Sequence, residues 1–439
     1  MLRYECRRPS RHLNLYFGLL LGGLCTPLAS AQTLQTPEQL TLQEALQSAF
    51  ANSPVLRAQR TELAQHQGGR LTAQTYPYNP QLELELADRS SLDSSTTDLG
   101  FSLSQELEVA GQRRLRTAVA ERRLAASRET LRRQEQLLAA QVESAFASAV
   151  RARELLALAE TEASLAREVL DFSQRRLERG ATSQIEVNLA RASAGRAERG
   201  VQRTRAAYAA AKSRTAELAG LEPASQPEPL GDLELPAGDL PPLEQLLQQA
   251  LDQRKDLSSL HQQEQAAEAA VRLALAERRP NLTVSAFFQR EESTDDIFGA
   301  TLGVALPLFN RNQGAIAERR ASRERARAHS DALELTIEQE VVAAWNDLRA
   351  ARTAAEALRD QVLGTLEDNL DLLQRSLAAG RIAATEVVTL RREFVAARRE
   401  YVEALADAWS ARTRLALAIG QSVLTEATSH DSMPGKELR

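Results

Sequence analysis

Hydrophobic and polar residues alternate along four short segments of the chain. Within residues 81–88, three leucines alternate with two glutamates, and the same period of two recurs over 98–109, 281–289 and 298–309. A period of two puts successive side chains on opposite faces, so each segment predicts a β-strand with one apolar and one polar face. Polar runs connect the two members of each pair. The pattern therefore predicts two β-hairpins.

Strands of about ten residues with this alternation are typical of transmembrane β-barrels, although a half-buried hairpin of a soluble protein shows it too. Four strands cannot close a barrel, since the smallest closures use about eight. If the sheet spans a membrane, chains must share one barrel, with eight strands from two chains or twelve from three. The residues expected to face lipid are Leu82, Leu84, Leu86, Phe101, Leu103, Leu282, Val284, Leu302, Val304 and Leu306.

Two very long segments have apolar residues at steps of three and four instead. They cover about residues 112–179 and 313–379, are rich in strong helix formers and contain no proline. Nearly 70 helical residues at 1.5 Å each give a rod of ~100 Å, which must be buried along its length by partner helices. Return helices are predicted over about 182–219 and 382–419, after glycines suited to a reversal of the chain.

These elements occur twice in the same order. Ala-Glu-Arg-Arg at 120–123 recurs at 317–320, and both long segments end before a glycine. Each copy therefore predicts a helix, two strands, a very long helix and a return helix. The expected boundaries are a first repeat over 32–220, a Pro-rich connector over 221–242, a second repeat over 243–420 and a polar, loosely ordered tail over 421–439.

The first 31 residues predict a cleavable secretory signal. A basic start precedes a short apolar run, and Ala29-Ser30-Ala31 supplies the small residues of a cleavage site. Both cysteines, Cys6 and Cys25, lie in this leader, so the mature chain would contain no thiol. Cys25 is an alternative lipidation site, although Leu24 stands where such sites have a small residue. Loss of the leader's four Arg and one Glu changes the net charge from -5 to -8.

Composition excludes several functions. The acidic balance provides no basic footprint for nucleic acid over the chain. Five scattered histidines, without ligand spacing, predict no metal centre and no cofactor. No nucleophile–base arrangement or phosphate-binding glycine loop is present in the sequence, so an enzyme is not expected.

Several motifs resemble the TolC-like outer membrane factors, the exit ducts of Gram-negative efflux and secretion systems. Residues 175–180 read Arg-Arg-Leu-Glu-Arg-Gly and, with the Ile-Glu-Val that follows at 185–187, resemble the family's periplasmic tip. Residues 375–387 resemble the second tip. Residues 306–314 read Leu-Pro-Leu-Phe-Asn-Arg-Asn-Gln-Gly and, with 108–113, are most similar to the CzcC-like branch that serves heavy-metal cation exporters.

The resemblance implies a mainly α-helical fold with a small β part. Three chains would form a twelve-stranded barrel in the lipid of the outer membrane, continued by a helical tunnel in the periplasm. It implies an inner-membrane RND permease, driven by protons, and a periplasmic membrane-fusion adaptor as partners, with export of cobalt, zinc or cadmium type cations. The adaptor would dock on the tips, at Gly180, Gly380, Arg175 and Arg375.

In this family, acids at the tips line or latch the closed entrance. Glu186 and Glu386 each follow a tip glycine by six residues, and Glu386 matches one such acid, but Thr389 stands where some members have a second. A solvated helix face explains both glutamates equally well. Two other interpretations stay open: an exit duct for drugs or secreted proteins, and a periplasmic coiled-coil scaffold without a barrel.

Overall fold

The computed structural model describes residues 39–90, 95–222, 225–234, 240–291, 295–366, 369, 372 and 384–421. The chain divides into a unit Met1–Thr36 and a unit Pro37–Arg439, and every described residue belongs to the second. The predicted signal sequence and Cys25 lie outside the described residues, as do Arg375, Gly380 and most of the predicted tail.

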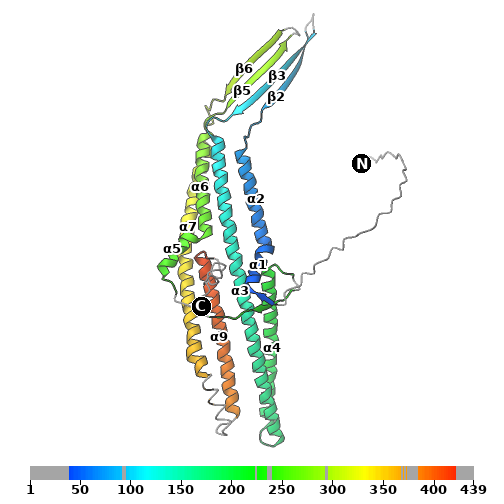
Figure 1. The fold of residues 1–439 in the computed structure, drawn as a ribbon, viewed down its shortest axis with the longest axis vertical. Helices are drawn as coiled ribbons and strands as arrows, with labels where there is room; N and C mark the ends of the chain where they lie inside the picture. Colours follow the sequence, from blue (N-terminus) through cyan, green and yellow to red (C-terminus); the bar gives the residue numbers. More distant parts are fainter. Residues whose placement is uncertain are drawn as a thin grey trace, which may run out of the picture. The chain divides into compact units, whose positions relative to one another are not determined.

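A four-stranded antiparallel sheet forms one end of this unit (Figure 1). Its strands have the order β2-β3-β5-β6, so the two hairpins lie side by side. The strands are β2 (Gln81–Ser90), β3 (Ser95–Leu107), β5 (Leu282–Glu291) and β6 (Asp295–Val304).

The last strand is shorter than the sequence predicts. It ends at Val304, whereas the alternation continues to residue 309. Pro307 has no N–H to give to a ladder, and proline is excluded from strand interiors for that reason. Leu306, expected on a strand, therefore lies two residues beyond β6.

The first long helix is α3 (Gln112–Glu178), an unbroken run of 67 residues. Its counterpart α7 (Gln313–Ala357) has 45 residues and continues into a π-helical turn, η1 (Leu358–Leu363). The prediction of one regular helix over 313–379 is wrong at this turn, where Gly364 N–H donates to the Arg359 carbonyl, five residues back. A π-turn fits one extra residue into the helix. Here it contacts α9, and Leu363 is buried.

Two helices, not one, precede each hairpin. In the first copy α1 (Leu42–Asn52) and α2 (Pro54–Gln74) are separated by Ser53, because Pro54 cannot continue a helix hydrogen-bond ladder. In the second copy α5 (Leu243–Gln253) and α6 (Lys255–Ala276) are separated by Arg254, which has an extended backbone and a buried side chain. No proline stands at the second break, so the sequence contains no local signal that the helix ends there.

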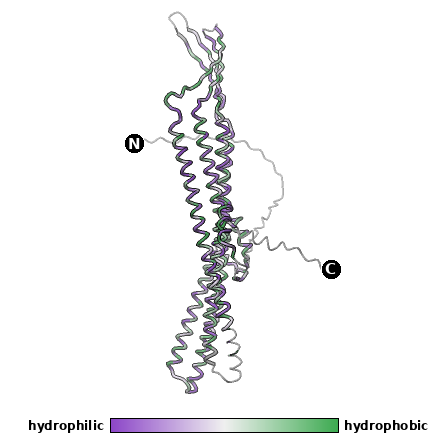
Figure 2. Tube along the Cα trace, turned by 90° about the vertical axis from the view of Figure 1, so that its left-hand side faces the viewer, coloured by the Kyte–Doolittle hydropathy of each residue, from purple (hydrophilic) through white to green (hydrophobic). Residues whose placement is uncertain are grey.

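The return helices are α4 (Gln184–Leu218) and α9 (Ala384–Ala418). Helix α3 contacts α2, α4, α6 and α9, and α7 contacts α6 and α9. Four helices therefore lie side by side next to the sheet, α2-α3-α6-α7, and four at the other end, α4-α3-α9-α7 (Figure 1). Figure 2 shows that hydrophilic and hydrophobic residues alternate along the helical part of the chain. The contacts between the helices are rich in alanine, for example Ala159 and Ala163 of α3 against Val201 of α4.

A short parallel pair of strands, which the sequence did not predict, lies beside the middle of α3. It joins β1 (Gln39–Thr41) to β4 (Glu228–Leu230), so part of the predicted Pro-rich connector is a strand. The Tyr208 hydroxyl and Lys212 ammonium of α4 both bond to the Glu228 carboxylate, the latter at 2.7 Å. Burial and this carboxylate raise the pKa of Tyr208.

Among the described residues, no helix combines the length and the apolar character needed to cross a bilayer.

Candidate functional site

The sheet has one apolar face. Side chains of directly paired residues lie on the same face of an antiparallel sheet. Leu84 pairs with Phe101, Phe101 with Phe288, and Phe288 with Phe298, which makes an apolar row across all four strands. Neighbouring rings in this row are 6.4 and 4.8 Å apart between centroids. The face is open to solvent in the single chain, with Phe298 78% exposed.

Nine of the ten residues predicted to face lipid lie together on this face. Pairing places Leu82, Leu84, Leu86, Phe101, Leu103, Leu282, Val284, Leu302 and Val304 there. The tenth, Leu306, lies beyond the strand and is 72% exposed. Contact of the nine with lipid stays a prediction.

The opposite face is polar and acidic. Its carboxylates, distributed from the base of the sheet to its outer end, are those of Glu83, Glu85, Asp98, Glu106, Glu291 and Asp295. Over the paired residues whose side chains the structure describes, the register assigns no Lys or Arg to this face.

Two large apolar residues, Phe287 and Ile297, interrupt the polar face. The ring of Phe287 covers Gly299 on the paired strand. It also borders a cavity of about 280 Å³ that Glu83 and Glu85 help to line. The ring therefore lies next to the carboxylates of this face.

A hydrogen-bonded network joins the sheet to the helices. The Asn281 amide donates to Glu106 Oε1 at 2.6 Å and to the Tyr78 hydroxyl at 3.1 Å, and its oxygen accepts from Gln112 Nε2 at 3.0 Å. The Tyr76 hydroxyl donates to the Glu106 carbonyl and accepts from Glu108 N–H, both at 2.9 Å. Burial and Glu106 raise the pKa of Tyr78. The two tyrosines thus join the segment before β2 to the end of β3 and to the residue before β5.

The first helical tip is a compact turn between α3 and α4. Gly180 adopts a left-handed backbone, φ +70°, and its N–H donates to the Leu177 carbonyl at 2.9 Å. Ser183 caps α4 by accepting from Glu186 N–H at 3.3 Å. Arg175 and Glu186 are both exposed, and the Thr182 hydroxyl donates to the Glu186 carboxylate. The predicted tip residues of the first copy therefore lie around one turn.

The second tip is not described to the same extent. Gly380 and Arg375 lie outside the described residues. Glu386 falls in the first turn of α9, as Glu186 does in α4, but its side chain lies outside the described part. The predicted roles of all these residues in docking and in the entrance constriction stay predictions.

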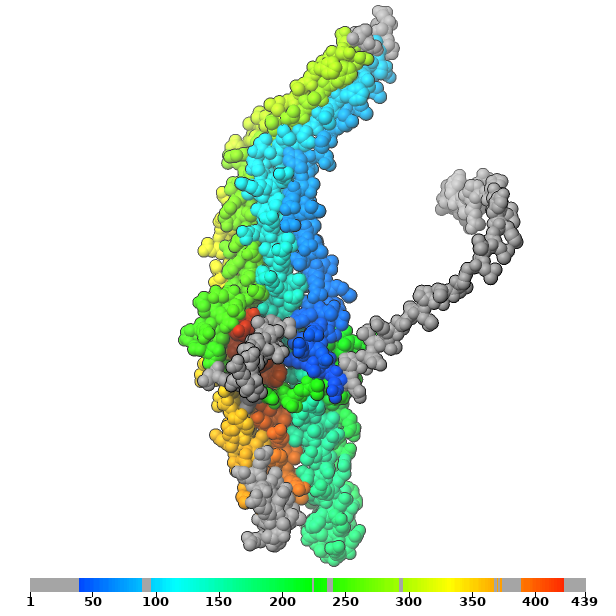
Figure 3. Space-filling model, in the orientation of Figure 1, coloured from blue at the N-terminus to red at the C-terminus, as the bar shows by residue number. Residues whose placement is uncertain are grey.

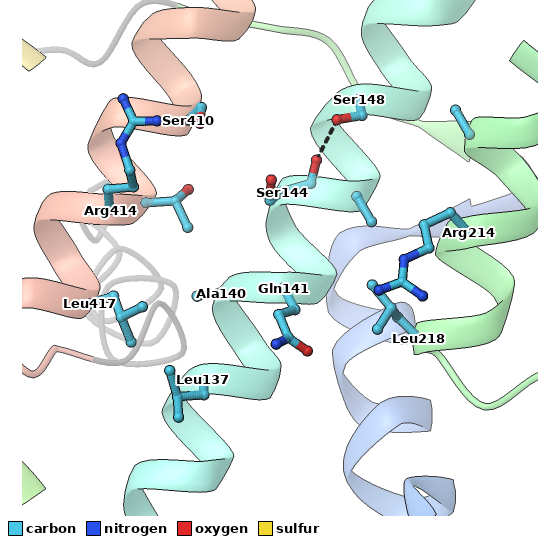
Figure 4. Close-up of a pocket in the computed structure, with 13 residues that line it drawn as sticks. Leu137, Ala140, Gln141, Ser144, Ser148, Arg214, Leu218, Ser410, Arg414 and Leu417 are labelled. Carbon is cyan, nitrogen blue, oxygen red and sulfur yellow. Dashed lines mark hydrogen bonds between the residues drawn. The ribbon is translucent and has the colours of Figure 1, made fainter. Parts of the chain in front are cut away.

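A groove of about 500 Å³ runs along α3 between α9 and α4 (Figure 4). Ser144 and Ser148 of α3 form its floor, with Arg414 of α9 on one side and Arg214 of α4 on the other. Arg414 is held by Asp347 of α7 at 3.3 Å, and Arg214 by Glu217 at 2.7 Å. The arginines are thus neutralised by their own chain.

A buried charge cluster lies where the helices of the second copy converge. The Arg254 side chain is 3% exposed and bonds to Asp256 at 2.6 Å and to Glu340. Arg133 of α3 adds an ion pair to Asp256 at 3.4 Å. Burial alone would raise the pKa of Asp256, but hydrogen bonds from Arg254 and the charge of Arg133 hold it below its ordinary value. Sequence reasoning missed this cluster, since Arg133 and Glu340 are far from the Arg254–Asp256 pair along the chain.

Within the part of the chain that the structure describes, no group of three or more His, Cys, Asp or Glu side chains could hold a metal ion. Of the three described histidines, His66, His261 and His329, His261 lies 3.6 Å from Glu334 on a helix surface. The described residues together form a two-faced sheet above bundled helices, and they contain no catalytic constellation.

The model of the outer membrane efflux protein family matches residues 45–221 and again 246–421. The chain belongs to this family. The two matches correspond to the two copies that the sequence pattern indicates, each with a helical start, a hairpin, a long helix and a return helix. The resemblance to TolC-like outer membrane factors is confirmed, and so is the mainly helical fold with a small sheet.

Relatives match over most of the chain. The cobalt-zinc-cadmium resistance protein CzcC of Cupriavidus metallidurans is 27% identical over 426 residues, which are 94% of this chain and all of CzcC. The outer membrane efflux protein BepC of Brucella suis is 24% identical over 434 residues, 96% of this chain and 92% of BepC. Among solved structures, the channel CusC has a TM-score of 0.70 at 17% identity, with 87% of this chain and 92% of CusC covered. VceC of Vibrio cholerae has a TM-score of 0.69 at 18% identity, with 87% of this chain and 96% of VceC covered.

Family membership narrows the open interpretations to an efflux duct and leaves its cargo, metal cations, drugs or secreted proteins, undecided. The chain is an efflux channel of the outer membrane, and neither an enzyme nor a barrel-free periplasmic scaffold.

Proposed function

We propose that the protein exports divalent metal cations of the cobalt, zinc or cadmium type. The observation that supports this most is the acidic polar face of the sheet, to which the register assigns six carboxylates. In a closed barrel this face would line the channel, and carboxylates beside low-dielectric walls concentrate cations. The full-length match to CzcC, whose name records cobalt, zinc and cadmium resistance, points to the same cargo.

We propose that three copies of the chain form the channel. Four strands leave two open edges, β2 and β6, and three chains would join these edges into twelve strands. A periplasmic adaptor and a proton-driven RND permease of the inner membrane would deliver the cation, with the adaptor on the helical tips. A heat-modifiable trimer in the outer-membrane fraction, with mature chains beginning at Gln32, is the expected form.

Ion selectivity in planar bilayers tests the acidic face. Glu85→Gln should lower the preference for cations, measured as the reversal potential in a salt gradient. Asp88→Asn is the matched control, because Asp88 pairs with Thr97 on the opposite face of the same strand. Equal effects of the two substitutions would contradict a channel-lining role for the polar face.

Metal tolerance of cells tests the cargo. Deletion of the gene should lower tolerance to zinc, cobalt or cadmium salts, and the wild-type gene should restore it. Unchanged metal tolerance together with new sensitivity to organic drugs would assign the duct to a different cargo.

A further inference from the structure

Five exposed arginines lie at the level where the strands meet the helices. Two are in the first turn of α3, two lie between α6 and β5, and one lies just before α7. These segments converge at the base of the sheet, where α2, α3 and α6 lie side by side (Figure 3). We call this set the arginine belt; it consists of Arg113, Arg114, Arg278, Arg279 and Arg311.

The belt differs from other arginines nearby in its lack of acidic partners. Arg116 is bound by Glu108, and Arg290 by Asp296 at 2.6 Å. Within the described part of the chain, no belt guanidinium forms an ion pair. One exposed acid, Glu277, adjoins the belt. The net charge of the belt and this neighbour is therefore strongly positive.

Exposed apolar side chains lie next to the belt on the side of the strands. Phe309 is 92% exposed and precedes Arg311 by two residues, and Val109 is 57% exposed and precedes Arg113 by four. In the third segment, between α6 and β5, Arg279 precedes Leu282, the first residue of β5. Three separate segments thus change from apolar to arginine at the same level. A bilayer has this order, hydrocarbon followed by headgroup phosphates.

We propose that the arginine belt binds the phosphate groups of anionic phospholipids in the membrane leaflet on the helical side. The planar guanidinium forms paired hydrogen bonds with phosphate oxygens, and basic residues within a Debye length of an anionic leaflet are attracted to it. The neighbouring apolar side chains select a lipid over free phosphate, because they need acyl chains to cover them. This inference rests on the outer-membrane placement and not on the metal cargo.

Native mass spectrometry of the full-length protein in mild detergent, titrated with phosphatidylglycerol, tests the belt. The triple variant R278Q/R279Q/R311Q should bind this lipid at least about tenfold more weakly, since three favourable charge interactions with the anionic headgroups are lost. The matched control R191Q/R199Q/R203Q removes the same charge from exposed positions of α4 and should bind like the wild type. Heat-modifiable migration of each variant establishes that it has folded.

Three results would overturn the proposal: equal weakening in the control, equally tight binding of zwitterionic phosphatidylcholine, or displacement of the lipid by inorganic phosphate. A shifted reversal potential with unchanged lipid binding would place the arginines in the channel lumen instead. Metal tolerance is measured separately from lipid binding. A result against lipid binding therefore leaves the cation-export proposal untouched, and a result against cation export leaves the lipid proposal untouched.

Discussion

Gly420 packs directly against the backbone of Arg254. A Cβ atom at Gly420 would lie 3.0 Å from the Arg254 nitrogen and 3.0 Å from the Gln253 carbonyl carbon. Gly220 has the same place in the first copy, where a Cβ would lie 2.7 Å from that of Asn52. In both copies the end of the return helix therefore packs on the break between the two helices that precede the hairpin.

This contact predicts a large effect of Gly420→Ala. Gly420 has φ +75°, where an L side chain costs about 1–2 kcal/mol, and crowding against rigid backbone adds about 1–3 kcal/mol. Gly180→Ala is the control, because φ is +70° but no atom lies within 4 Å of the added carbon. The thermal midpoint in detergent should fall clearly further for Gly420→Ala. Similar shifts would show that backbone strain alone explains both.

The ring of Phe287 predicts a coupled pair on the polar face of the sheet. An added Cβ at Gly299 would lie 2.2 Å from the ring's Cζ atom, so Gly299→Ala must push the ring away from the strand. If this face lines the channel, single-channel conductance should fall. Phe287→Ala combined with Gly299→Ala should restore conductance to the wild-type value or above. A double variant no better than Gly299→Ala alone would refute the coupling.

The depressed pKa of Asp256 predicts stability that depends on pH. A carboxylate whose pKa is lower in the folded state contributes stability above its ordinary pKa, and that contribution is lost as the pH falls through the folded-state value. Asp256→Asn should therefore destabilise the protein by about 1–2 kcal/mol at neutral pH, with the difference from wild type shrinking in acid. Thermal midpoints recorded from neutral to acidic pH measure this. Asp252→Asn, at an exposed position of α5, should show little difference at any pH.

The predicted entrance constriction can be tested at the tips. Replacing Glu386 with Ala should reduce block of the channel by divalent cations or change its conductance in bilayers, because three copies of an acid around a narrow pore attract cations. Glu186→Ala provides the comparison from the first tip, where the Thr182 hydroxyl already bonds to the carboxylate. Unchanged conductance and block in the Glu386 variant would support a solvated helix face.

The periodicity of apolar residues and the positions of glycine and proline made most of the fold predictable. Alternation at Leu82, Leu84 and Leu86 indicated the strand and its two faces, and the proline-free spacing of three and four predicted α3 to within a residue of Glu178. Local signals failed where the deciding partner is remote. At the break between α5 and α6, Arg254 forms an ion pair with Glu340 of α7, a partner 86 residues away that local spacing does not indicate.

The duplication, the strand faces, the long helices and the family could all be inferred from the amino-acid order, because each follows from periodicity or from a contiguous motif. The meeting of distant segments could not. Only the tertiary structure established the pairing of β3 with β5, the β1–β4 strands, the π-turn after Ala357 and the network around Asn281. Register, buried ion pairs and glycine packing depend on distances between elements, and a one-dimensional pattern contains no such distances.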